Sequence, residues 1–103
     1  MIAKSDFGIE QVLLDEIIEL ARQYQVEKLI LFGSRARGDY KKKSDIDLAF
    51  YGGEARRFIL AVDEDTHTLL EFDIINMNGA VQEALRESIN KEGVLLYEKI
   101  WKF

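Results

Sequence analysis

Apolar residues recur along this chain with two different periods, and the changes of period divide its first half into a helix and two strands. From 9 to 24 they recur every three or four residues, which predicts an amphipathic helix. The stretch 27–33, EKLILFG, is a short apolar run ended by glycine and predicts a buried strand. Residues 44–53, SDIDLAFYGG, alternate polar or small side chains with large apolar ones, so a strand with two different faces is expected. The polar stretch 34–43 connects these two strands.

The second half continues with helices and strands in alternation. A three- and four-residue apolar spacing predicts a helix within 54–65, and TLLEFDIINM, 68–77, returns to the two-residue period of a strand. A third helix, capped by Asn78 and ended by Gly93, precedes a last strand at 94–98. This order predicts an α/β (α+β) fold, in which a small mixed β-sheet carries helices mainly on one face.

Composition narrows the function classes. The 103 residues contain no repeat or linker, so residues 1–103 are expected to form a single domain that shares any large substrate with a second molecule. A net charge of -5 argues against strong nucleic-acid binding or an anionic membrane surface, and the absence of cysteine excludes disulfides and thiolate metal sites. Neither a signal peptide nor a run long enough to cross a bilayer is visible, so no membrane association and a cytoplasmic location are expected.

Two aspartates in the second strand are the first candidates for chemistry. Asp45 and Asp47 are two residues apart, so their side chains leave the same strand face with α-carbons about 6.5–7 Å apart. Carboxylate oxygens at that spacing suit Mg²⁺, which completes its shell with water and substrate phosphates. Gly33 and Ser34, at the turn before them, could bind those phosphates through a closely approaching backbone and a hydroxyl.

Three further residues complete or surround this group. If the strand containing Asp73 lies beside that of Asp45, three carboxylates converge and could hold two Mg²⁺ ions, with Asp73 also able to accept a proton. The apolar neighbours of Asp73 predict a largely buried strand, although a surface position on an edge strand is the alternative. Arg37 is favoured for neutralising a pyrophosphate leaving group, whereas Arg35 is more readily interpreted as a solubilising or ion-paired arginine.

The motifs together resemble a known family. GSRARG followed by SDIDL, with ten residues between Ser34 and Asp45, and the later FDIIN resemble the signature of the polymerase-beta-type nucleotidyltransferase superfamily. At this length the chain is most similar to the minimal nucleotidyltransferases (MNT) of bacteria and archaea. The resemblance implies transfer of AMP from ATP with magnesium, with Gly33 and Ser34 on the phosphates and Asp45, Asp47 and Asp73 on the metal.

The same resemblance implies a biological role. Members of the family are commonly encoded beside a helical HEPN-domain toxin, which some of them silence by adding AMP to a tyrosine, so this chain is similar to the antitoxin of such a pair. The residues themselves support only phosphate and metal chemistry.

Several alternatives stay open at this stage. The protein could neutralise its partner by binding alone with an idle nucleotide site, or it could modify a small molecule, while a polymerising module fits its acidic charge poorly. Homodimer and hetero-oligomer are both open, because Leu14 and Ile18 exceed a single apolar stripe and the C-terminal aromatic residues could pack inward or form an interface. The residues of that tail are Tyr97, Ile100, Trp101 and Phe103.

Overall fold

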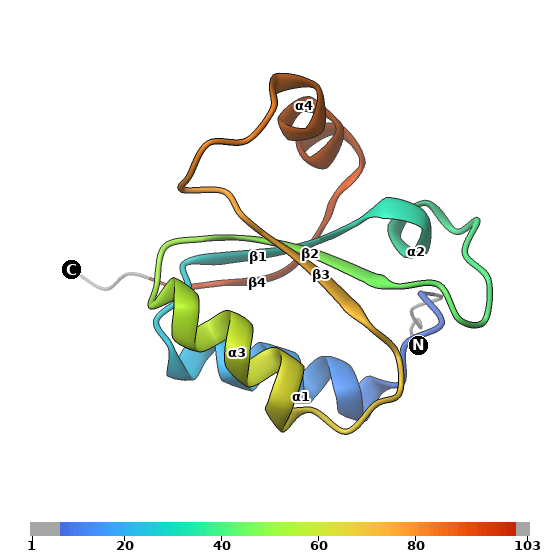
Figure 1. Cartoon of the computed structure of the whole chain (residues 1–103), viewed down its shortest axis with the longest axis horizontal. Helices are drawn as coiled ribbons and strands as arrows, with labels where there is room; N and C mark the ends of the chain where they lie inside the picture. The colour runs from blue at the N-terminus through green and yellow to red at the C-terminus, as the bar shows by residue number, and fades with distance from the viewer. Residues whose placement is uncertain (1–6, 101–103) are drawn as a thin grey trace.

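The computed structural model describes residues 7–100, which form four helices and four strands in the expected order with one short helix added (Figure 1). The predicted tail residues Trp101 and Phe103 lie outside the described residues. The elements are α1 (Gln11–Gln23), β1 (Lys28–Phe32), α2 (Gly33–Arg37), β2 (Ile46–Tyr51), α3 (Ala55–Asp65), β3 (Phe72–Asn76), α4 (Glu83–Glu92) and β4 (Val94–Glu98).

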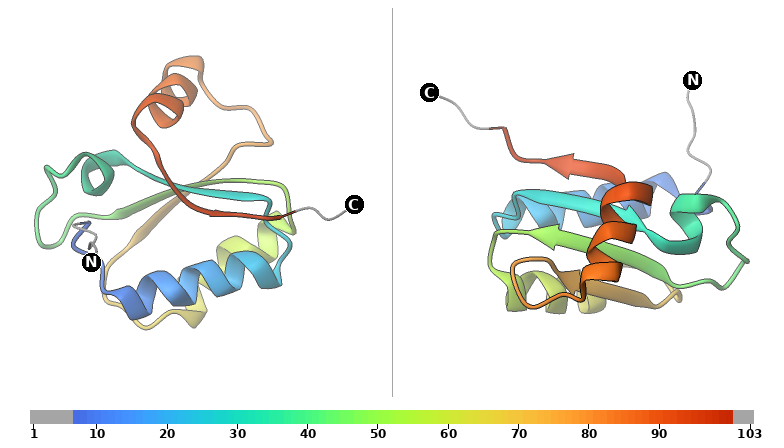
Figure 2. Two further views of the ribbon diagram at one scale, coloured as in Figure 1. Left: turned by 180° about the vertical axis from the view of Figure 1, so that it is seen from behind. Right: turned by 90° about the horizontal axis from the view of Figure 1, so that it is seen from above.

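The strands form one mixed sheet in the order β3-β2-β1-β4. Strand β1 runs antiparallel to both β2 and β4, whereas β2 and β3 are parallel. A parallel pair needs a crossover connection, and α3 provides it, lying on the same side of the sheet as α1 (Figure 2). Strands β3 and β4 are therefore the edges of the described sheet.

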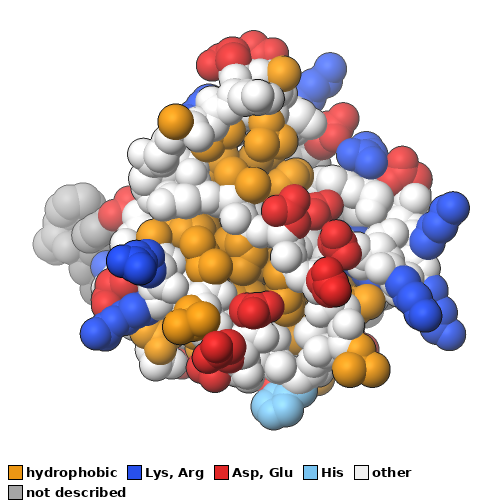
Figure 3. All heavy atoms as spheres, in the orientation of Figure 1, with side chains coloured by type: hydrophobic (Ala, Val, Ile, Leu, Met, Phe, Trp, Pro, Cys, Tyr) orange, Lys and Arg blue, Asp and Glu red, His pale blue; other side chains and the backbone are white. Residues whose placement is uncertain are grey.

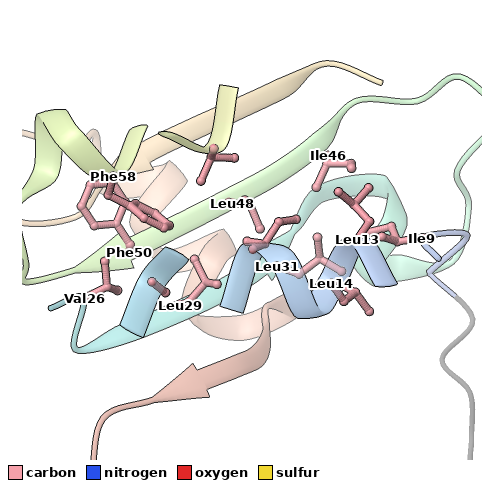
Figure 4. Packing of buried hydrophobic residues seen from close by; sticks show 13 residues of the cluster. Ile9, Leu13, Leu14, Val26, Leu29, Leu31, Ile46, Leu48, Phe50 and Phe58 are labelled. Atoms are coloured by element: carbon pink, nitrogen blue, oxygen red, sulfur yellow. The ribbon is translucent and has the colours of Figure 1, made fainter. Parts of the chain in front are cut away.

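Helices cover the two faces of the sheet unequally, as the sequence predicts. The main core lies between the sheet and the helices α1 and α3, where residues such as Leu13 and Leu14 pack towards Leu31 and Ile46 of the strands (Figure 4). In the same core the rings of Phe50 and Phe58 meet edge to face with centroids 5.1 Å apart. Helix α4 covers only part of the opposite face, over a smaller cluster of Ile30, Phe32, Ala49, Met77 and Ile89.

One sequence-based expectation about the helices is wrong in detail, and one open alternative is resolved. The third long helix begins at Glu83, not after Asn78, because the Asn78 side chain instead accepts a hydrogen bond from the backbone N–H of Gly52, 3.0 Å away. Leu14 is not a surface residue for another subunit, since it is buried in the main core and Ile18 is half-buried. The exposed apolar residue of α1 is Val12. None of the helices within residues 7–100 has the length and apolar character needed to span a membrane.

Candidate active site

The candidate site begins with the alternation of side chains along β2. Ile46, Leu48 and Phe50 face the main core, so the intervening Asp47 and Ala49 face the side partly covered by α4. Ala49 lies beneath α4, whereas Asp47 lies nearer the start of the strand, and Asp45 directly precedes it. The sequence-predicted pair thus occupies the part of this face that α4 does not cover.

Strand β3 supplies the third carboxylate. In the parallel pairing of β2 and β3, Asp73 is the direct partner of Asp47. Direct partners on neighbouring strands project to the same face, so Asp73 joins the predicted pair. Figure 3 shows acidic side chains gathered along the surface where β3 crosses the front of the molecule. We call Asp45, Asp47 and Asp73 the carboxylate row.

The expectation that Asp73 is largely buried is wrong. Its side chain is exposed and the residues of β3 are only half-buried, because β3 is an edge strand with a neighbour on one side alone. Its apolar neighbours Phe72 and Ile74 face the main core without enclosing the carboxylate. Exposure leaves Asp73 accessible to a ligand.

Like charges within the row disturb the ionisation of Asp47. Burial raises the pKa of its carboxyl group above the ordinary value, and the negative charges of Asp73 and then Asp45 raise it further. Arg37 and Arg35 lower the same pKa only in part. The row is therefore short of positive charge, and a cation placed there would favour the ionised form of Asp47.

The donor set fits magnesium in chemical type. Carboxylate oxygens are the ligands that this ion prefers, and it commonly takes only one or two from the protein when substrate phosphates supply the rest. Within residues 7–100, no three acidic or histidine side chains converge closely enough to form a complete metal site by themselves. A metal at the carboxylate row would therefore depend on oxygens from a bound nucleotide.

Gly33 and Ser34, which we call the glycine corner, lie beside the carboxylate row on the side of β2 that faces away from β3. Phe32, the last residue of β1, pairs with Asp47, and Gly33 follows with a φ of 77°. A β-carbon at Gly33 would collide with the Asp47 carboxylate, so only glycine allows the backbone to lie this close. The half-buried Ser34 is next, and its carbonyl oxygen accepts hydrogen bonds from the N–H groups of Gly38 and Asp39.

Arg35 has a structural role that sequence reasoning missed. Its side chain is only 1% exposed and its guanidinium group stacks over the Tyr40 ring at 5.0 Å. The guanidinium donates hydrogen bonds to the backbone carbonyls of Phe7, Gly8, Lys42 and Ser44, at 2.9–3.3 Å. The interpretation of Arg35 as a solvated arginine is wrong, and no sequence signal exists for its role, because every residue has a backbone carbonyl.

Arg37 is exposed and paired with acidic side chains. It contacts Asp39 at 3.3 Å and Glu92 of α4 at 3.5 Å, and these contacts raise its pKa, chiefly through the hydrogen bond to Asp39. Its charge also acts on Asp47. A phosphate group near the row would therefore compete with Asp39 and Glu92 for this guanidinium.

The chain is similar in sequence to a known protein family and to an archaeal protein. The family model for "Polymerase beta, Nucleotidyltransferase" matches residues 15–100. A Methanocaldococcus jannaschii protein named "Putative protein adenylyltransferase" is 33% identical over 100 residues, which cover 85% of this chain and 97% of the relative.

Solved structures show the same fold. A chain of a toxin–antitoxin crystallised with AMP-PNP superposes with a TM-score of 0.64 at 23% identity, covering 84% of this chain and 73% of that one. A mutant of the toxin–antitoxin MntA-HpeT gives a TM-score of 0.61 at 25% identity, covering 82% and 72%.

Proposed function

Since the chain belongs to the polymerase beta nucleotidyltransferase family, we propose that it transfers AMP from ATP to a tyrosine hydroxyl of a HEPN-type toxin and so acts as its antitoxin. The observation that carries the proposal is the direct pairing of Asp47 with Asp73, next to the glycine corner on the other side of β2. The carboxylates at the centre of this arrangement can hold metal ions, and at one side Gly33 lets the backbone approach a phosphate closely. Phosphoryl transfer needs both features.

Each part of the site has a role in the proposed reaction. The acceptor oxygen attacks the α-phosphorus of ATP, the bond from that phosphorus to the oxygen bridging to the β-phosphate breaks, and pyrophosphate leaves. Asp73 takes the proton of the acceptor hydroxyl, because it is an exposed carboxylate on the edge strand β3, which an incoming hydroxyl can approach. Gly33 and Ser34 hold the phosphates, and Arg37 exchanges its acidic partners for the departing pyrophosphate.

Magnesium belongs to the proposal as a cofactor. Two ions held by Asp45, Asp47 and Asp73 would supply neutralising charge for the triphosphate and the developing alkoxide or phenoxide. The raised pKa of Asp47 supports this assignment, because the protein alone leaves the row with uncompensated negative charge. A cytoplasmic location, where ATP and magnesium are both abundant, is part of the same proposal.

The partner is proposed from the comparisons and from the size of the domain. Two of the solved structures with this fold are toxin–antitoxin structures, and one of the two was crystallised with AMP-PNP. The domain of 103 residues has little surface for enclosing an acceptor, which favours a folded protein that brings its own hydroxyl group. We therefore propose that the acceptor hydroxyl belongs to a helical toxin encoded beside this protein.

Intact-mass measurement tests the proposal directly. The protein is incubated with its genomic neighbour, magnesium and each nucleoside triphosphate in turn, and both proteins are weighed. We expect the neighbour to gain AMP from ATP, and we expect Asp47→Asn or removal of magnesium to prevent the gain. An Arg57→Gln variant, changed on the exposed surface of α3 away from the row, is the control and should transfer normally. No gain with any nucleotide would contradict the proposal.

A further inference from the structure

Arg35 binds two segments that lie far apart in the sequence and meet next to the carboxylate row. Its Nη1 donates to the carbonyl oxygens of Phe7 and Gly8, at 2.9 and 3.0 Å, in the segment before α1. Its Nε and Nη2 donate to the carbonyl oxygen of Ser44, at 3.1 and 2.9 Å, in the α2–β2 connection. Asp45 follows Ser44 directly, so the guanidinium group holds the backbone at the residue before the row.

The side chain of Arg35 does not itself reach a substrate. It is 1% exposed, and the Tyr40 ring covers its guanidinium group at 5.0 Å. The three nitrogen atoms of the group are already bonded to backbone carbonyls. Apart from the long-range effect of its charge, Arg35 can therefore act on the reaction only through the backbone segments that it joins.

Gly8 lets the segment before α1 pack directly against Arg35. Its φ is 69°, and a β-carbon at this position would collide with the Tyr40 ring and with Nη1 of Arg35. Ile9, the next residue, is buried in the main core beside Leu13 (Figure 4). The segment is therefore fixed on one side by the core and on the other by the guanidinium group.

The α2–β2 connection closes on itself just before Asp45. The N–H of Ser44 donates to the carbonyl oxygen of Lys41 at 3.0 Å, and the Ser44 hydroxyl oxygen accepts from the Lys41 N–H at 2.7 Å. These bonds fix the turn internally, whereas the bonds from Arg35 fix it relative to α2 and to the segment before α1. Metal ligands must be held within about 0.5 Å of their productive geometry, so the placement of this turn matters for Asp45.

We propose that Arg35 is a positioning residue for the magnesium and nucleotide site, which acts through the Ser44 carbonyl group on Asp45. By fixing that carbonyl group, Arg35 sets the direction in which the chain enters Asp45 and β2. The segment at Gly8, 27 residues before Arg35, belongs to the same support and lies close to α2 in space (Figure 1, Figure 2). The inference rests on the proposed function, since magnesium and ATP are assigned to the site there.

Three variants of the whole protein test this role without requiring turnover. Arg35→Lys keeps the positive charge but lacks the planar set of donors that joins the two segments, and Gly8→Ala places a methyl group against Arg35. Phe58→Leu is the control, because it shortens a buried ring whose partner, Phe50, lies near the opposite end of β2 from Asp45. Each variant is measured at a temperature at which circular dichroism shows it to be folded.

Isothermal titration with the magnesium complex of AMP-PNP and amide hydrogen exchange followed by NMR are the two readouts. We expect Arg35→Lys and Gly8→Ala to weaken nucleotide binding by about 10–100-fold, the usual effect of removing a group that orients metal ligands. The Ser44 amide hydrogen, which bonds within the turn, should exchange faster in both variants. Phe58→Leu should lower the Tm and leave both readouts unchanged, as would Arg35→Lys if Arg35 served stability alone.

The outcomes separate this inference from the proposed function. Unchanged affinity and exchange in Arg35→Lys, or equal losses in the Phe58→Leu control, would overturn the positioning role. A loss in Arg35→Lys but not in Gly8→Ala would support the role of Arg35 and exclude the segment before α1. Wild-type protein that binds the nucleotide without transferring AMP would refute the proposed enzyme, while the affinities of the variants would still decide the positioning role. Wild-type protein that binds no nucleotide would refute both.

Discussion

Gly33 is the residue whose substitution has the clearest structural consequence. Its φ of 77° is unfavourable for other residues, and a β-carbon would enter the space of the Asp47 carboxylate. Gly33→Ala should therefore lower the free energy of unfolding by about 1–3 kcal/mol for overpacking, in addition to the backbone cost. It should also weaken ATP binding. Urea denaturation and nucleotide titration measure the two effects.

Gly38 is the matched control for this substitution. It has a φ of 97°, but nothing lies within 4 Å of the position that a β-carbon would take. Gly38→Ala should incur only the cost of the left-handed backbone and should bind ATP normally. If both variants lost the same stability and the same affinity, close approach to Asp47 would not be the reason for glycine at position 33.

Asp47 should reduce stability at neutral pH. The pKa of Asp47 is raised in the folded protein, so the folded state binds the proton more tightly than the unfolded state does. Protonated Asp47 therefore stabilises the protein at a pH below its ordinary pKa. This contribution is lost as the pH rises through the pKa of the folded state. Asp47→Asn should consequently raise the Tm at pH 7 in metal-free buffer. The advantage should shrink as the pH falls through the raised pKa of Asp47 in the folded protein, because the wild-type carboxyl group is then protonated as well.

Thermal melts of both proteins across this pH range check the prediction. An Asp39→Asn variant is a useful comparison, because Asp39 is an exposed carboxylate paired with Arg37 and should show no such gain at pH 7. A Tm difference for Asp47→Asn that grew towards acid pH would contradict the assigned direction of the pKa.

At the scale of elements, Arg35 joins the short helix α2 to two segments that have no regular structure of their own. Its hydrogen bonds reach carbonyls before α1 and in the α2–β2 connection. Arg35→Ala should lower the free energy of unfolding by about 3 kcal/mol or more, because the charged hydrogen bonds of a buried guanidinium group to several backbone carbonyls are lost. Arg35→Lys should restore little, since an ammonium group lacks the planar set of donors.

Arg37 on the same helix is the control for Arg35. Its ion pairs with Asp39 and Glu92 are exposed, and pairs of that kind contribute at most about 1 kcal/mol. Arg37→Ala should therefore leave the urea midpoint nearly unchanged while weakening ATP binding. Similar losses of stability in the Arg35 and Arg37 variants would show that burial does not distinguish the two arginines.

For the whole molecule, the proposed antitoxin role depends either on catalysis or on contact with the partner alone. Combining Asp45→Asn with Asp47→Asn changes the carboxylate row without altering the size of either side chain. We expect this variant to bind the helical partner as the wild type does, since both positions lie outside the main core, but to fail in protecting cells from it. Co-purification and growth assays measure the two outcomes.

Protection by the double variant would support the alternative in which this chain neutralises its partner by binding alone. A variant that lost both protection and complex formation would place the row in the interface itself. We propose that residues 1–103 act as one minimal domain in either case, because the four strands within residues 7–100 form a single sheet.

The sequence by itself determined the local features of this protein. Side-chain periods of two and about 3.6 residues located its principal strands and helices, and the two-residue spacing placed Asp45 and Asp47 on one face, because these relations depend only on neighbours along the chain. The motif around Gly33, Ser34 and the aspartates was enough to identify the family. The cap assigned to Asn78 failed because its side chain bonds to Gly52, a partner 26 residues away.

Only the tertiary structure decided how distant segments meet. The order of strands made β3 an edge strand, and the register of its pairing set Asp73 opposite Asp47. The alternation within 68–77 could not specify this pairing. A shift of register by one residue would have turned Asp73 to the other face. The backbone carbonyls that bind Arg35 likewise lie in loops that pack together without a side-chain pattern of their own. Local periodicity fixes which face a residue occupies, whereas long-range pairing fixes what that face meets.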